Sequence, residues 1–151
     1  MQKQANAFTL IELIVAVTVA GIAILALATV FQESMRNMER QRALQSANLL
    51  AEELMNEIRS KEFSSTNSFP TNYRVNFDDV DDYTNLFESP PRTIEGILIP
   101  DFSGFSRRVI VTNVSPSNFN LATSNSDFKR ITVVVSNAVI IVSNMSVVGR
   151  I

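Results

Sequence analysis

The chain has 151 residues, with 13 Lys and Arg against 15 Asp and Glu, and it contains neither histidine nor cysteine. This length suits one domain, or a small domain with an anchor, and the nearly balanced charge gives no bulk attraction to nucleic acid. The commonest general base, the commonest metal ligand and all thiolate chemistry are excluded. Catalysis would depend on carboxylates, hydroxyls or lysine alone, so the composition favours a protein that is not an enzyme.

A long uncharged segment lies close to the amino terminus. Residues 13–31 read LIVAVTVAGIAILALATVF and contain no charge and no proline. A helix of this length spans about 28 Å, close to the thickness of a hydrocarbon core. It is apolar on every face, unlike a surface helix of a soluble domain. The segment therefore predicts a helix buried in lipid or among similar helices, with Gly21 and several alanines permitting close approach.

Glu12 stands at the start of this apolar segment. An acid at mid-bilayer costs about 2.5–3.5 kcal/mol even on a lenient insertion scale. Three ordinary interpretations are a secretory signal peptide cleaved after Ala28, a signal-anchor helix, and a buried helix of a soluble fold. Glu12 argues against the first, because such signals are usually purely apolar there. The length and the missing polar face argue against the third.

The junction between MQKQANA (residues 1–7) and FTLIELIVAVTVAGIAILALA (residues 8–28) is abrupt. It resembles the class III signal of type IV pilins and of the pseudopilins of type II secretion. The resemblance implies that a prepilin peptidase cleaves between Ala7 and Phe8 and methylates the new amine of Phe8. Glu12 becomes the fifth residue of the mature chain, where the family carries its glutamate. Ala7 replaces the usual glycine, and Thr29 stands where many major pilins have a helix-breaking proline.

This resemblance gives Glu12 a role in assembly, as a hypothesis. The Phe8 amine would be a cation beside the apolar layer, and Glu12 an anion one helical turn away. In a staggered stack, Glu12 of an incoming subunit would pair with the Phe8 amine of a neighbour. Either charge is expensive when it is unpaired in hydrocarbon, so the pair would check the register of each added subunit.

The resemblance also implies a location and partners. The chain would cross a bacterial inner membrane once, with its globular part in the periplasm, and would then join a pilus or pseudopilus. Its partners would be other pilin-like subunits, the prepilin peptidase and an inner-membrane assembly platform, with no nucleic acid. The balance of Lys and Arg around the helix disagrees, because only Lys3 precedes it and three arginines follow closely, Arg36, Arg40 and Arg42. We give the cleavage motif more weight, since its processing requires a cytoplasmic leader.

Residues 32–63 continue in helical register without glycine or proline. Apolar residues recur there at steps of three and four, which predicts one apolar stripe: Leu44, Ala47, Ala51, Leu54 and Ile58. The polar residues Glu52, Glu53, Asn56, Glu57 and Arg59 are expected on the remaining surface. We predict one helix of about fifty-five residues whose stripe packs on a sheet, or alternatively forms a short heptad seam with a partner helix.

Alternating and β-branched runs predict strands at residues 73–77 and 106–114, and two more within residues 129–149. The last two would flank a tight turn at Ser136-Asn137, where asparagine tolerates a positive φ. Val133, Val135, Val139 and Ile141 would cover the amphipathic helix, and residues 64–72 and 115–127 would be polar loops. The expected fold is α+β, a long helix on a small, mostly antiparallel sheet, which the pilin resemblance also implies.

The expected organisation is therefore a leader (1–7), a transmembrane helix (8–31), an amphipathic helix (32–63) and a periplasmic β-rich domain (64–151). Three shorter motifs, LLAEELMNEIRSKEF, FDDVDDY and SGFSRRVIV, resemble minor pilins of the PilV and mannose-sensitive haemagglutinin-biogenesis kind. They favour a minor pilin or pseudopilin with a priming, tip or binding role. The rival functions are a periplasmic binding domain released after Ala28 and a membrane-anchored carboxylate enzyme.

Two charged clusters remain. FDDVDDY carries the carboxylates of Asp78, Asp79, Asp81 and Asp82, and oxygen ligands this dense can hold Ca²⁺. The spacing is not that of an EF-hand, and a solvated acidic turn is the favoured interpretation, so calcium is the sole cofactor candidate. Arg107 and Arg108 form a basic pair in a predicted strand. The pair is too small to indicate DNA binding, and we expect exposed charges at a sheet edge.

Overall fold

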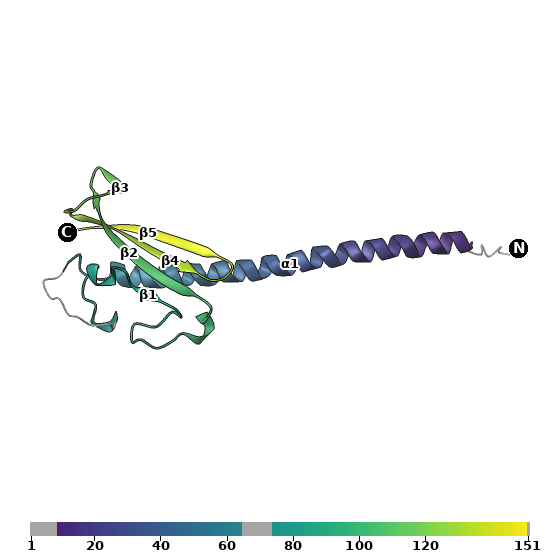
Figure 1. The fold of residues 1–151 in the computed structure, drawn as a ribbon, viewed down its shortest axis with the longest axis horizontal. Coiled ribbons are helices and arrows are strands. Elements are labelled where there is room, and N and C mark those ends of the chain that lie inside the picture. Colours follow the sequence, from purple (N-terminus) through teal and green to yellow (C-terminus); the bar gives the residue numbers. More distant parts are fainter. Residues whose placement is uncertain (1–8, 65–73, 151) are drawn as a thin grey trace, which may run out of the picture. The chain divides into compact units, whose positions relative to one another are not determined.

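The computed structural model describes residues 9–64 and 74–150 (Figure 1). The chain divides into two compact units, Met1–Glu39 and Arg40–Ile151, and each is described by itself. Helix α1, Leu10–Arg59, contributes residues to both units.

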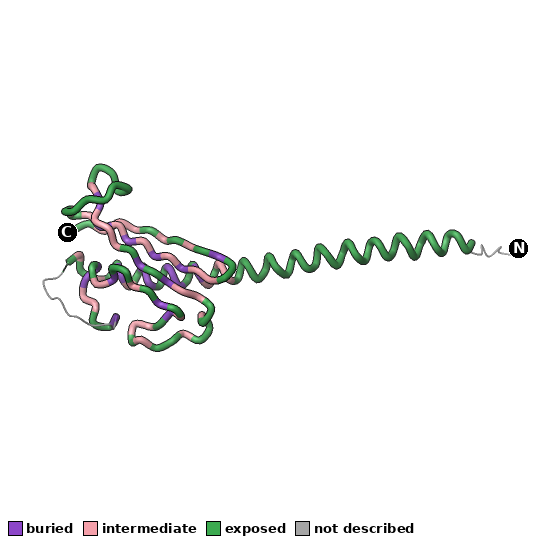
Figure 2. The backbone as a smooth tube through the Cα atoms, viewed as in Figure 1, coloured by how far each residue is buried: buried purple, intermediate pink, exposed green. Residues whose placement is uncertain are grey.

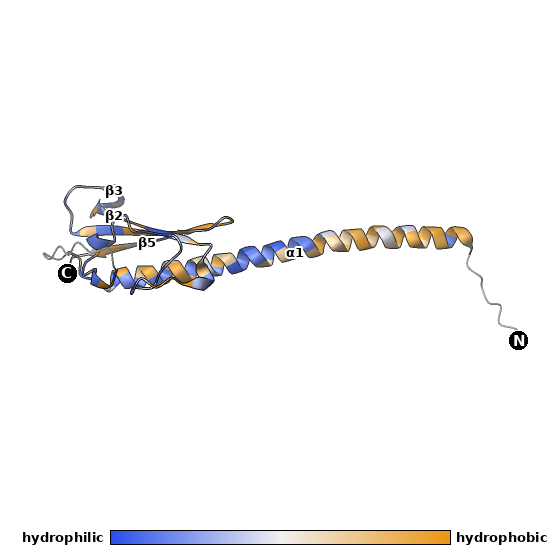
Figure 3. Ribbon diagram, turned by 60° about the horizontal axis from the view of Figure 1, so that its bottom comes forward, coloured by the Kyte–Doolittle hydropathy of each residue, from blue (hydrophilic) through white to orange (hydrophobic). Residues whose placement is uncertain are grey.

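The first unit is the apolar part of α1 and the beginning of its polar part (Figure 3). Every residue described from position 9 to 42 is exposed, including the large apolar ones (Figure 2). By length and composition, α1 can cross a membrane near its amino-terminal end. The helix is unbroken at Thr29, whose hydroxyl donates a hydrogen bond of 2.8 Å to the carbonyl of Ala26. The helix thus continues through the position at which a proline would break it.

In the second unit, the end of α1 packs on the sheet. Ala47, Ala51, Leu54 and Ile58 are fully buried, and Leu44 packs against the same core. The predicted apolar stripe is confirmed, and Leu50 and Met55 widen it. Its partners on the sheet are Val109, Ile131, Val133 and Val135. Burial of each large aliphatic side chain stabilises the fold by about 1.5–3 kcal/mol.

The described residues form a sheet in the order β1-β2-β4-β5, with all pairs antiparallel. Its strands are β1 (Phe87–Glu88), β2 (Ser106–Ser115), β4 (Phe128–Ser136) and β5 (Ile141–Gly149). Strand β3 (Asn118–Ala122) pairs with Val114 and Ser115 at the end of β2, and the register shifts between these two residues. The predicted α+β fold, with a long helix packed on a small antiparallel sheet, is confirmed.

The described part of the connection between α1 and β2 contains three short 3₁₀ helices: Arg74–Asn76, Asp81–Tyr83 and Pro100–Phe102. The strand predicted at residues 73–77 is wrong, because residues 74–76 are helical and Tyr73 lies outside the described residues. α1 also ends four residues earlier than predicted. After Arg59 the chain turns so that Glu62 forms an isolated bridge with Asp79, and the carbonyl of Glu62 accepts a 3.0 Å hydrogen bond from the amide of Val80.

The final hairpin is confirmed, but its turn is not the predicted one. Ser136 pairs with Ile141, so four residues form the turn. The Asn137 side chain accepts hydrogen bonds from the amides of Val139 and Ile140. The predicted positive φ is wrong, since Asn85 is the only non-glycine residue in the described ranges that adopts one.

This turn length decides which face of β5 covers the helix. Val135 pairs with Val142, and directly paired residues of an antiparallel sheet share a face. Val142 and Val148 therefore pack against the core, whereas Val139 and Ile141 are 66% and 75% exposed. The prediction for Val133 and Val135 is confirmed, and that for Val139 and Ile141 is wrong. The polar loop predicted at residues 115–127 is also wrong in part, because it contains β3.

Candidate functional site

The first candidate site is the amino-terminal turn of α1. Thr9 precedes the helix, and its carbonyl accepts backbone hydrogen bonds from Glu12 (3.1 Å) and Leu13 (3.2 Å). The Thr9 hydroxyl also lies 3.4 Å from the amide of Glu12. A carboxylate in the first turn is favoured by the partial positive charge of the helix terminus. Ala7 and Phe8, which carry the predicted cleavage and methylation, lie outside the described residues.

Glu12 is exposed and lies in a shallow groove along the helix surface. Ile11, Val15, Ala16 and Val19 line the groove beside it, so the carboxylate is surrounded by apolar side chains. A surface of this kind is unfavourable in water and must be covered by lipid or by other helices. The arrangement places one acid within a surface that is otherwise suited to helix packing.

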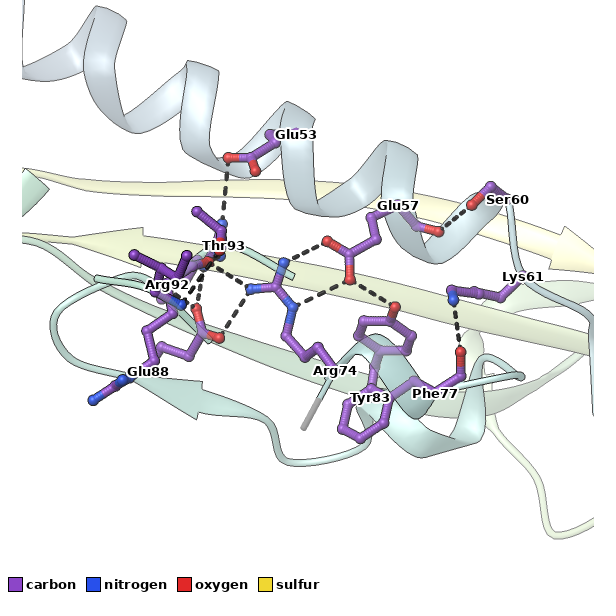
Figure 4. A network of polar contacts seen from close by, with 12 residues as sticks. Glu53, Glu57, Ser60, Lys61, Arg74, Phe77, Tyr83, Glu88, Arg92 and Thr93 are labelled. Atoms are coloured by element: carbon purple, nitrogen blue, oxygen red, sulfur yellow. Dashed lines mark hydrogen bonds and ion pairs between the residues drawn. The ribbon is translucent and has the colours of Figure 1, made fainter. Parts of the chain in front are cut away.

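The second candidate site is a buried network of charged side chains in the second unit (Figure 4). Arg74 donates hydrogen bonds to both carboxylate oxygens of Glu57, at 3.1 and 2.5 Å, and to Glu88 at 2.9 Å. The hydroxyl of Tyr83 donates to Glu57 at 2.7 Å. The prediction that Glu57 lies on the surface is therefore wrong. Its carboxylate holds the segment that follows α1 against the helix.

Arg107 extends this network into the sheet. Its Nε donates to Glu88 at 2.6 Å, and its Nη2 donates to the carbonyl of Arg92, which also accepts from Arg74. Among the described residues Arg107 Nη1 has no hydrogen-bond partner, but it lies 3.6 Å from a carboxylate oxygen of Glu53.

The Arg107 side chain is fully buried. The prediction of an exposed basic pair is thus wrong for Arg107, whereas Arg108 points to the opposite face and is exposed. The signal that could have found this was strand alternation. It places Arg107 on the same face as the buried Val109, with Arg108 between them.

The pKa directions within the network follow from its geometry. Burial lowers the pKa of Arg74, but hydrogen bonds and the opposite charges of Glu57 and Glu88 raise it, and the net direction is upward. Burial raises the pKa of the Tyr83 phenol well above its ordinary value, and the hydrogen bond to Glu57 raises it further. The guanidinium stays charged and the phenol stays neutral, which suits a structural network.

Because the pKa of Tyr83 is raised in the folded state, we predict that the folded chain loses stability at alkaline pH. The folded state favours the neutral phenol, so this contribution is complete below the unfolded pKa of about 10 and is lost as the pH rises above it. Above this pH, Tyr83 should lower the free energy of unfolding by up to about 1.4 kcal/mol for each pH unit. Tyr83→Phe should remove this slope and lower stability at pH 7 by about 1.5–3 kcal/mol, through loss of a hydrogen bond to a carboxylate. Urea unfolding of the full chain in detergent between pH 7 and 11 tests it, and equal slopes for both proteins would contradict it.

Of the four acidic residues predicted as candidate calcium ligands, the structure brings three together. Carboxylate oxygens of Asp78, Asp79 and Asp82 lie within 4.8 Å of one another, whereas Asp81 forms an ion pair of 2.7 Å with Lys129. Asp82 accepts a 3.0 Å hydrogen bond from the amide of Asp78, and Asp79 accepts one of 3.1 Å from the amide of Asp82. These bonds stabilise the turn before Tyr83. Calcium binding by the three clustered acids stays a prediction.

A comparison with models of known protein families finds a match at the amino terminus. Residues 2–28 match the model of the prokaryotic N-terminal methylation motif. The match covers the junction before Phe8, Glu12 and most of the apolar helix, and it supports the superfamily of type IV pilins and pseudopilins. Together with the apolar helix it supports a membrane-anchored subunit that assembles with other pilin-like subunits after processing by prepilin peptidase. The whole chain matches no curated protein and no solved structure.

Proposed function

We propose that this chain is a minor pilin or pseudopilin. The prepilin peptidase cleaves it between Ala7 and Phe8 and methylates the Phe8 amine. The processed chain is anchored in the bacterial inner membrane with its β-rich unit in the periplasm. An assembly platform then adds it to a type IV pilus or a secretion pseudopilus, where it primes assembly, occupies the tip or presents a binding surface.

The observation that carries this proposal is the exposed Glu12 at the head of an exposed apolar helix. The isolated chain covers none of the described residues from 9 to 31, so this apolar surface needs lipid before assembly and neighbouring helices afterwards. An acid within it is unfavourable until a cation is provided. The processed amine of a neighbouring subunit is such a cation, and the methylation motif supports its existence.

The second unit supports a structural role. The buried cations Arg74 and Arg107 are matched by the carboxylates of Glu57 and Glu88, and the network joins α1, the following connection and the first two strands. It holds the connection and the strands to the last turns of α1. A membrane-anchored enzyme would need a reactive group in a cleft, and these charged groups are occupied with one another.

Fractionation of cells that have an assembly platform tests the proposal. The chain processed before Phe8 should occur in the inner membrane and in sheared filaments, and deletion of the platform should remove only the filament fraction. The rival domain, released after Ala28, would occur in the soluble periplasm in both strains. Recovery there, or a filament fraction that is unaffected by the platform, would contradict the proposal.

A further inference from the structure

The first cation after the apolar part of α1 takes no part in either candidate site. Phe31 is the last residue of the apolar part, and Arg36 follows it in the polar segment that Figure 3 shows next along the helix. The helix is unbroken between them, and every residue from 31 to 36 is exposed. None of the ion pairs found among the described residues involves Arg36. Its guanidinium is therefore open to a group outside the chain.

Helix geometry places Arg36 at the level of lipid headgroups when the apolar part spans a bilayer. An α-helix advances about 1.5 Å per residue, so Arg36 lies about 7.5 Å beyond Phe31 along the axis. The headgroup layer on each side of the hydrocarbon core is about 5–7 Å thick. Helical side chains also lean toward the amino-terminal end, which here is the end in the membrane. The guanidinium of Arg36 therefore reaches back into the headgroup layer.

The chemistry of Arg36 suits the phosphate of an anionic lipid. A guanidinium is a planar fork that donates two parallel hydrogen bonds to two phosphate oxygens. Phosphatidylglycerol presents such a phosphate without a cation in the same headgroup, whereas phosphatidylcholine carries one. Attraction of one arginine to an anionic surface corresponds to about a fivefold effect. Glu33 and Glu39 lie in the same exposed segment and oppose this attraction, so the decisive comparison is between chains with and without Arg36.

Lipid is the partner that every membrane-anchored copy has beside Arg36. The apolar residues before it are exposed in the isolated chain, and in the membrane lipid covers them before assembly. The headgroups of these same lipids begin where the apolar part ends. A carboxylate of a neighbouring subunit could contact Arg36 only after assembly.

We infer that Arg36 binds the phosphate of an anionic lipid at the membrane surface that α1 meets after Phe31. This inference rests on the membrane anchoring in the proposed function, but not on the direction in which the helix crosses. Glu12 lies about 28 Å before Phe31 along the axis, close to the thickness of the hydrocarbon core. A phosphate held by Arg36 therefore keeps Phe31 at one boundary of the hydrocarbon and Glu12 near the other.

Tryptophan fluorescence of the full chain in vesicles tests this inference. The chain contains no tryptophan, so Phe31→Trp provides a single probe at an exposed position. The vesicles contain equal amounts of phosphatidylglycerol and phosphatidylcholine, and one lipid or the other carries bromine on its acyl chains, which quenches a nearby tryptophan. The ratio of the two quenching values measures the enrichment of phosphatidylglycerol around the probe. Adding Arg36→Gln should lower this enrichment about fivefold.

The matched control is Asn37→Gln, which exchanges an exposed neutral neighbour in the same segment and should leave the enrichment unchanged. An enrichment that Arg36→Gln does not lower, or that Asn37→Gln lowers equally, would overturn the inference.

The vesicles contain neither an assembly platform nor another subunit, so the result is independent of the fractionation that tests the proposed function. A chain that enriches phosphatidylglycerol but is absent from filaments would refute the proposed function alone. A chain that occurs in filaments without this enrichment would refute the lipid site alone. A probe that neither brominated lipid quenches would refute the membrane anchoring on which both rest.

Discussion

Glu12→Ala should leave the protein in the membrane and greatly reduce its incorporation into filaments. The substitution removes an acid from the apolar segment, so insertion becomes easier, but it leaves the Phe8 amine of a neighbouring subunit unpaired. An unpaired charge in this environment costs about 2.5–3.5 kcal/mol on the lenient scale. That corresponds to roughly a hundredfold loss at equilibrium. The measurement is the ratio of protein in sheared filaments to protein in the inner membrane.

Two further variants show whether the charge is responsible. Glu12→Gln keeps the size of the side chain and removes its charge, so it should behave like Glu12→Ala. Glu33→Ala removes an exposed acid from the same helix beyond the apolar segment, and its incorporation should be normal. Normal incorporation of Glu12→Gln, or an equal loss for Glu33→Ala, would count against the pairing of Glu12 with a neighbouring amine.

The second large effect is expected from Arg107→Gln, compared with Arg108→Gln. The Arg107 side chain is fully buried and paired with Glu88, and removal of one partner of a buried ion pair costs about 3–5 kcal/mol. Arg108 is exposed, and its guanidinium carbon lies 5.3 Å from the centre of the Phe87 ring. Its replacement should therefore cost about 1 kcal/mol or less. Urea unfolding of the full chain in detergent compares these two adjacent arginines.

A double variant separates loss of charge pairing from loss of packing. Arg107→Met with Glu88→Met removes both partners and leaves the pair of Arg74 with Glu57 in place. It should destabilise the chain by less than the sum of the two single changes, because each single change leaves an uncompensated buried charge and the double change does not. Additive costs would contradict a role for the buried charge pair, and an equal cost for Arg107→Gln and Arg108→Gln would contradict the assignment of burial.

The periodic recurrence of apolar residues along the sequence predicted the fold well. The recurrence of Ala47, Ala51, Leu54 and Ile58 identified the buried face of α1, because helical spacing directly reports which side chains share a face. The β-branched runs likewise located β2, β4 and β5. For the first site, Glu12 was found because a charge within an apolar segment is conspicuous. Its surroundings on the helix follow from the sequence alone.

The contacts that Glu57 makes in the buried network could not be predicted in the same way. Glu57 lies in the helix between the polar Asn56 and the apolar Ile58, and only the tertiary fold brings Arg74 and Tyr83 to it. Local spacing contains no information about such contacts. The face of β5 was also missed, because it depends on the length of the turn and a shift of one residue reverses every side chain.

The mass of the mature amino-terminal peptide tests the central claim most directly. In cells that have the processing peptidase, we expect a peptide that begins at Phe8 with a methylated amine. The pairing of Glu12 with a neighbouring subunit requires that amine. A chain that still begins at Met1, or one that begins at Thr29, would contradict the account.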